Sequence, residues 1–221
     1  HTFNQNVGYT TNRVELGSGR TIMGYGPRGE DNLYYHAKSI KEITALINQR
    51  NCGAIDNDYN NQQPYYLEEP SSLTYNVPTG TPLILGNDFV IDDKDDSQLQ
   101  FNWDQMDGTL TVYPPINTST VGPSFISQYP NINQIRHLPD LATVIQGSTE
   151  SEFEVIPQLS REMNFTFTVR DNKEGGGAVM QEDFKINFIQ SENGIFKIFS
   201  QNTKGLTVSQ DEEIEIRWNH L

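Results

Sequence analysis

The chain has 221 residues, of which 35% are hydrophobic and 10% aromatic, and its 15 basic and 29 acidic residues give a net charge of −14. Nucleic-acid binding needs a basic surface, so this charge argues against nucleic acid as a partner. No segment approaches the roughly 18 consecutive apolar residues of a membrane-spanning helix, and no signal peptide is recognisable. A single cysteine excludes a disulfide framework within these residues. We expect a folded, soluble chain or a mature piece of a longer protein, with no nucleic acid partner and no membrane insertion.

A sharp turn is predicted near the N-terminus, in the stretch GSGRTIMGYGP at residues 17–27. Glycines stand on both sides of a short apolar run, and glycine is the residue that tight turns accept most readily. The turn places Met23 within it and Tyr25 two residues later. A methionine in a turn is more often a flexible side chain that fills a packing gap than part of a site.

One amphipathic helix is predicted at residues 39–50. Ser39 and Glu42 have the spacing of a capping box, in which each side chain bonds to a backbone amide of the first turn. Apolar residues then recur at helical spacing: Ile40, Ile43, Leu46 and Ile47. The polar segment 56–64 has no periodicity and predicts a domain boundary after the helix.

From about residue 66 the sequence alternates between apolar and polar residues, which predicts strands with one face in a core and one in water. The inward sets are Leu99, Phe101 and Trp103; Met163, Phe165, Phe167 and Val169; and Phe184, Ile186 and Phe188. The glycine-rich stretch 171–177 joins the last two strands as a hairpin. Shorter strands are predicted at 82–85, 89–91, 110–113 and 153–156, with an irregular connection between 124 and 146. This pattern predicts a mainly β fold, an antiparallel Ig-like β-sandwich preceded by a small α-containing lobe.

The C-terminal segment has two more alternating stretches, at 195–200 and 214–218. In the second, Ile214, Ile216 and Trp218 are expected to face inward. An isolated pair of strands is only marginally stable in water, so these strands either join the sandwich or begin a further β domain. The predicted organisation is a lobe at 1–63, a sandwich at 64–192 and the additional strands at 193–221.

Three short motifs surround the predicted turn: HTFN at 1–4, TIMGY at 21–25 and YYHA at 34–37. Their order resembles the C-terminal half of a metzincin catalytic domain, and most closely the reprolysin-like zinc metallopeptidases of secreted bacterial multidomain proteins. The resemblance implies that His1 is the third zinc-binding histidine, that Met23 is the Met-turn methionine beneath the metal, and that Tyr25 lies near the zinc. It covers about residues 23–52 and extends more diffusely to NWDQMD at 102–107 and TVRDN at 168–172.

The sequence departs from this family in one important respect, because the motif His-Glu-x-x-His is absent. Zinc hydrolysis needs three protein ligands, an open water position and a carboxylate that takes the proton. Thr2 also stands where animal reprolysins have Asp. The resemblance therefore implies a fragment of a secreted bacterial peptidase that acts on protein or peptide substrates, inactive as given, with the rest of its zinc site upstream. His36 is expected to be a structural histidine ahead of the helix.

An acidic stretch between two predicted strands is a second candidate site. Carboxylates spaced along a loop can wrap Ca²⁺, which takes about six to eight oxygen ligands. The stretch lacks the glycine and terminal glutamate of an EF-hand, and an acidic turn is most often simply solvated, so both interpretations stay open. The candidate calcium ligands are Asp88, Asp92, Asp93, Asp95 and Asp96.

A non-enzymatic alternative is that the whole chain is an Ig-like or cadherin-like binding or adhesion module of a multidomain surface protein, with the N-terminal segment packed on it. A third hypothesis is a carbohydrate-binding sandwich that uses exposed aromatic residues. Those residues are scattered along the sequence: Tyr65, Tyr66, Tyr113 and Tyr129. A His-Glu-x-x-His motif shortly before His1 would favour the peptidase over both.

Overall fold

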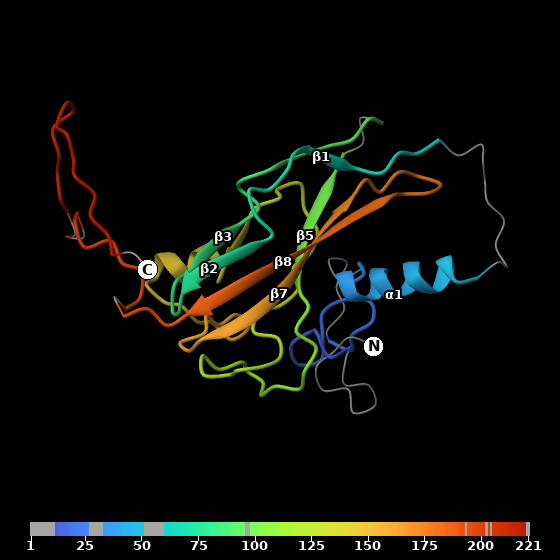
Figure 1. The fold of residues 1–221 in the computed structure, drawn as a ribbon, viewed down its shortest axis with the longest axis horizontal. Coiled ribbons are helices and arrows are strands. Elements are labelled where there is room, and N and C mark those ends of the chain that lie inside the picture. The colour runs from blue at the N-terminus through green and yellow to red at the C-terminus, as the bar shows by residue number, and fades with distance from the viewer. Residues whose placement is uncertain are drawn as a thin grey trace.

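The computed structural model describes residues 12–26, 33–50, 60–95, 98–192, 194–201, 203 and 205–219. The protein is mainly β, as predicted (Figure 1). The elements are α1 (Ala37–Asn48), β1 (Tyr65–Glu68), β2 (Thr74–Pro78), β3 (Leu83–Leu85), β4 (Val90–Asp92), β5 (Gln100–Gln105), β6 (Arg136–Leu138), α2 (Leu141–Ile145), β7 (Arg161–Arg170) and β8 (Val179–Ile189).

The largest sheet has four strands in the order β2-β8-β7-β5. The predicted hairpin is confirmed, because β7 and β8 pair antiparallel along their whole length, and β5 pairs antiparallel with β7. β2 instead runs parallel to β8, with Thr74 opposite Lys185 and Pro78 opposite Ile189. The prediction of a purely antiparallel arrangement is therefore wrong for this sheet. Two smaller antiparallel sheets, β1-β4 and β3-β6, complete the strand pairing.

The core lies on the face of the four-stranded sheet that the alternating residues predict. Met163, Phe165, Phe167 and Val169 of β7 are at most 2% exposed. The side chain of Phe167 lies beside Trp103, with ring centroids 4.7 Å apart. Residues from the smaller sheets and their loops, including Leu85, Phe89 and Leu138, cover this face. Each fully buried side chain of this kind stabilises the fold by about 1.5–3 kcal/mol.

The opposite face of β7 is also buried, which corrects the prediction that it faces water. Thr166 and Thr168 are 0% exposed and Arg170 is 8% exposed. The segment that leads into α1 covers this face, and a guanidinium nitrogen of Arg170 donates to the carbonyl of Tyr35 (2.9 Å). Period-two alternation cannot reveal this, since small polar residues look the same in water and beneath a polar interface.

Several shorter predictions are wrong. The range 110–113 forms no strand and leads into Tyr113-Pro114, where proline lacks the amide that a sheet needs. The range 153–156 contributes only isolated bridges, at Glu154 and Val155. The connection 124–146, predicted to be irregular, contains β6 and α2.

The C-terminal segment leaves the sheets after β8 and extends away from them, as the red part of Figure 1 shows. It forms no strand among the described residues and contains one bridge, between Ile198 and Trp218. The side chains predicted to face inward are instead exposed: Ile214 (42%), Ile216 (54%) and Trp218 (52%).

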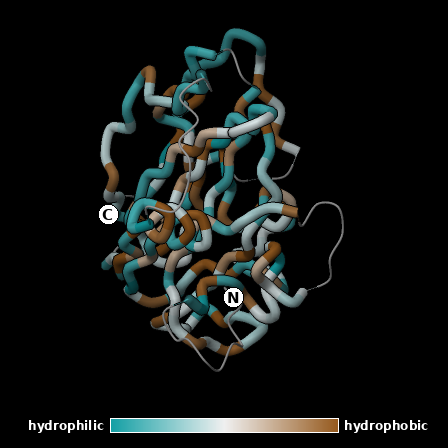
Figure 2. The backbone as a smooth tube through the Cα atoms, turned by 90° about the vertical axis from the view of Figure 1, so that its right-hand side faces the viewer, coloured by the Kyte–Doolittle hydropathy of each residue, from teal (hydrophilic) through white to brown (hydrophobic). Residues whose placement is uncertain are grey.

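Hydrophobic and hydrophilic residues alternate in short stretches along the described parts of the chain, as the brown and teal segments of Figure 2 show. No described helix combines the length and the apolar character needed to cross a membrane.

Candidate functional site

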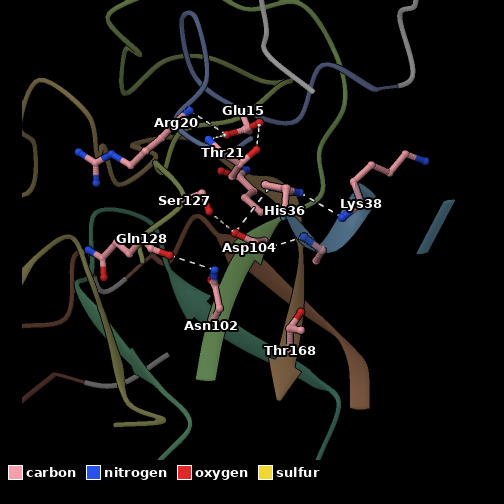
Figure 3. A network of polar contacts seen from close by, with 12 residues as sticks. Glu15, Arg20, Thr21, His36, Lys38, Asn102, Asp104, Ser127, Gln128 and Thr168 are labelled. Atoms are coloured by element: carbon pink, nitrogen blue, oxygen red, sulfur yellow. Dashed lines mark hydrogen bonds and ion pairs between the residues drawn. The ribbon is translucent and has the colours of Figure 1, made fainter. Parts of the chain in front are cut away.

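The turn that carries Met23 is built around the buried carboxylate of Glu15. Glu15 is 2% exposed and accepts three hydrogen bonds, from the amides of Arg20 and Thr21 (2.9 Å each) and from the hydroxyl of Thr21 (2.8 Å) (Figure 3). A carboxylate that receives several donors in this way fixes the backbone that supplies them. This role of Glu15 could not be predicted, because the residue belongs to no recognisable motif.

Backbone contacts close the turn across residues 18–26. The amides of Tyr25 and Gly26 both donate to the carbonyl of Ser18 (2.6 and 3.1 Å), and Gly26 also donates to Gly19 (3.0 Å). A Cβ atom on Gly26 would lie 2.1 Å from the carbonyl oxygen of Gly19, and one on Gly24 would lie 2.8 Å from its carbonyl carbon. The predicted sharp turn is therefore confirmed, and its glycines are required by the close approach of the two backbone segments.

The two turn residues that the resemblance singles out lie near the surface. Met23 is half-buried, and Tyr25 is 63% exposed. His1 lies outside the described residues, so the structure does not place it relative to either side chain.

Replacing Gly26 with alanine is expected to open this turn, because the new methyl group must displace the backbone of Gly19. Strain of this kind costs about 1–3 kcal/mol. We expect faster amide hydrogen exchange at Gly24 and Tyr25, whose amides close the turn. Gly194→Ala is the control for destabilisation elsewhere: its φ of 79° also strains a side chain, but it lies outside the turn, so exchange at Gly24 and Tyr25 should be unchanged. Unchanged exchange in the turn of Gly26→Ala would contradict the prediction.

The turn is tied to the sheet through the segment just before α1. The amide of Ile22 donates to the carbonyl of Tyr34 (3.1 Å), and the hydroxyl of Tyr34 donates to Ser127 (2.9 Å). Burial, together with the nearby carboxylate of Asp104, raises the pKa of Tyr34 above its ordinary value. Tyr34 therefore stays protonated and acts here as a hydrogen-bond donor.

Asp104 is the centre of the buried network in Figure 3. It lies on β5 and is 0% exposed. One carboxylate oxygen accepts the hydroxyl of Ser127 and lies 3.7 Å from Nε2 of His36, and the other accepts the amide of Ala37 (2.8 Å). The start of α1 is thereby fixed to β5, the edge strand of the four-stranded sheet, by a fully buried carboxylate.

The helix begins differently from the prediction. His36 caps α1, and its Nδ1 atom accepts a hydrogen bond from the amide of Lys38 (3.1 Å). Because Nδ1 accepts this bond, the ring proton lies on Nε2, which is 3.7 Å from Asp104. Ser39 is buried inside the first turn and does not cap the helix, so the predicted capping box is wrong. The structural role predicted for His36 is confirmed.

Ser127, His36 and Asp104 have the composition of a hydrolase triad but not its geometry. In a triad the histidine stands between the serine and the carboxylate and takes the serine proton. Here the hydroxyl of Ser127 donates directly to Asp104. All three side chains are at most 4% exposed, so a substrate has no access to them. The network positions α1 and the turn on the sheet, and it has no nucleophile.

Two further contacts fix the same segment. Arg170 on β7 donates to the carbonyl of Tyr35, and Gln181 on β8 donates to the carbonyl of Ala37 (3.2 Å). Burial lowers the pKa of Arg170, while Asp104 raises it. The sequence pattern placed Arg170 on a solvated face, and Asp104 follows the last residue of its alternating set, so neither was recognisable as part of a network.

The acidic stretch predicted as a calcium site is spread over several separate contacts. Asp88 accepts hydrogen bonds from Ser71 and Tyr75, and Asp92 accepts one from Tyr65 (3.1 Å). Asp95 pairs with Lys173 (3.5 Å).

Asp93 is 5% exposed and accepts the amide of Asp95, and Asp96 lies outside the described residues. Within the part of the chain that the structure describes, no group of three or more His, Cys, Asp or Glu residues could hold a metal ion. Calcium binding stays a prediction.

Comparisons with known proteins identified no relative of this chain. No protein-family model, no curated protein and no solved structure matches the chain.

Proposed function

We propose that the chain is part of a secreted bacterial zinc metallopeptidase, the Met-turn and closing helix of its catalytic domain followed by an Ig-like β-sandwich. The observation that supports this is the turn at 18–26. Buried Glu15 and the close approach of Gly26 to Gly19 hold it rigidly, with Met23 half-buried and Tyr25 63% exposed. A turn that only reversed the chain would not need such support.

The described residues do not form a zinc site by themselves, since they contain no group of three ligands. In the proposal, His1 and an upstream His-Glu-x-x-His motif hold the metal, which activates water for peptide hydrolysis. In this proposal, the present chain provides Met23 beneath the metal and places the hydroxyl of Tyr25 beside the substrate carbonyl.

The first test is the intact mass and N-terminal sequence of the product made by the native host. We expect a species well above the 25.1 kDa of this chain, with a zinc-binding helix ahead of His1, bound zinc and chelator-sensitive peptidase activity. The 221-residue chain alone is expected to bind zinc poorly, because one ligand cannot hold it. A native species that starts at or near His1, or tight stoichiometric zinc in the 221-residue chain, contradicts the proposal.

A second test concerns Tyr25 in the longer form. Loss of one donor that stabilises an oxyanion lowers kcat by about 10²–10³-fold, and we expect Tyr25→Phe to do so with little change in KM. Tyr35→Phe is the matched control, since Tyr35 is also exposed (40%) and contributes its backbone carbonyl to the fold. Equal activity of the two variants would remove Tyr25 from the mechanism.

A binding or adhesion module without catalysis is the second candidate. It is favoured by the buried contacts from β5, β7 and β8 to the segment 34–37, which make the N-terminal part an integral layer on the sheet. A native product that begins near His1 and lacks peptidase activity would support this function.

A further inference from the structure

An aromatic cleft of about 220 Å³ opens between β3 and the β2 side of the four-stranded sheet. Trp103, Phe184 and Phe89 line it and are each at most 5% exposed, so they form its deep part. Ile84 is 48% exposed and lies at the rim. A space lined by several large aromatic side chains is suited to a flat or chain-like apolar group.

A carboxylate stands at the rim of this cleft. Asp88 is exposed, and its Oδ2 atom accepts both the hydroxyl of Tyr75 (2.7 Å) and that of Ser71 (2.9 Å). Both bonds end on the same oxygen, so Oδ1 keeps its full capacity as an acceptor. The two hydroxyl donors also hold the carboxylate in one orientation, and Tyr75 itself lines the cleft.

The surroundings of the cleft are negatively charged. Tyr66 packs edge-on against Phe89 with ring centroids 5.5 Å apart. Its pKa is raised by burial and further by the carboxylates of Glu182, Asp88 and Glu69. None of the described residues that line the cleft is basic. A cation that entered the cleft would therefore be attracted by the carboxylates and would meet no basic side chain on its walls.

We propose that this cleft binds a small organic ammonium ion whose apolar body packs against Trp103 and Phe184, which contact each other at the base of the cleft (ring centroids 4.9 Å apart), and whose ammonium group pairs with Asp88. Aromatic faces attract cations as well as apolar groups, which suits both ends of such a ligand. The volume is below the about 300–1,000 Å³ of sites for drug-sized ligands, which favours a molecule of the size of phenylethylamine. This site is independent of the proposed peptidase function.

The experiment is a titration of the 221-residue chain with phenylethylamine, followed by the fluorescence of Trp103. The chain has two tryptophans, and Trp218→Phe removes the exposed second one from the signal. We expect saturable binding that weakens about tenfold or more in Asp88→Asn, because the ammonium group then meets a neutral amide and the ion pair is lost. The neutral analogue 2-phenylethanol is expected to bind at least tenfold more weakly than the amine.

Asp92→Asn is the matched control, since it removes one negative charge from a neighbouring strand that does not line the cleft. It should change the affinity by less than twofold. Circular dichroism checks that each variant is folded. Absence of a saturable signal, equal binding of amine and alcohol, or equal effects of the two substitutions would each overturn the proposal, the last by showing only general attraction to an acidic protein.

Discussion

Replacing Asp104 with alanine is expected to lower the free energy of unfolding by about 3–5 kcal/mol, the loss typical when one member of a buried charged network is removed. The substitution leaves the amide of Ala37 and the hydroxyl of Ser127 without their acceptor in a region that water does not reach. It also leaves the buried guanidinium of Arg170 without the carboxylate that favours its charge. Urea-induced unfolding measures the change.

Hydrogen exchange distinguishes this effect from general destabilisation. If Asp104 holds the helix to the sheet, the amides of α1 lose protection in Asp104→Ala before those of β7 and β8. Asp104→Asn should lose less stability, because the amide oxygen of the asparagine still accepts one of the two hydrogen bonds. Glu162→Ala is the control: Glu162 is half-exposed and paired with Lys185, and its removal is expected to leave stability nearly unchanged. A stable Asp104→Ala with a protected α1 would contradict this role.

Replacing Arg136 with methionine is expected to cost a similar amount, about 3–5 kcal/mol at neutral pH. Arg136 on β6 pairs with Glu154, and both side chains are at most 5% exposed. The second oxygen of Glu154 accepts the amide of Asp140 (2.6 Å). Without the arginine, the carboxylate stays buried and unpaired. The double variant Arg136→Met/Glu154→Met should recover most of the loss, because no unpaired charge is then left at this position.

The stability of Arg136→Met should also depend on pH. Burial raises the pKa of Glu154 above its ordinary 4.5, and Arg136 lowers it, so removing Arg136 raises it further. A group with a raised folded pKa contributes stability below its unfolded pKa and loses it as the pH rises through the folded pKa. The deficit of Arg136→Met should therefore shrink as the pH falls from 7 toward about 4.5. A deficit that is constant with pH would contradict this.

The strands of the large sheet are predictable from sequence because their apolar residues alternate without interruption. Met163 to Val169 and Phe184 to Phe188 show the period clearly, and the glycine-rich loop between them specifies a hairpin. β6 is not predictable from the sequence, because its three residues Arg136, His137 and Leu138 include only one apolar side chain and show no alternation. The parallel pairing of β2 with β8 is also beyond sequence reasoning, since neither strand encodes its partner.

The candidate site was predictable only in part. The glycine pattern around Met23 predicts the turn, because its close backbone approach tolerates no side chain. The carboxylates that hold it in place are not predictable: Glu15 and Asp104 act through partners that are distant in sequence or belong to no motif. Alternation assigned Arg170 to water and did not place Asp104 on either face, whereas both lie beneath the N-terminal layer.

The pairing of β2 with β8 also determines the order in which the parts of this protein can fold. Residues 74–78 must wait for residues 185–189 before their edge of the sheet can close, and such long-range contacts make folding slow. The acceptor and donors that fix the start of α1, Asp104, Arg170 and Gln181, come from the same late-formed sheet. A chain that emerges N-terminus first from a ribosome or an export channel therefore makes its turn and helix early but docks them last. Until β8 has emerged, the edge of β7 lacks its partner strand, and its unpaired backbone groups can pair with another chain.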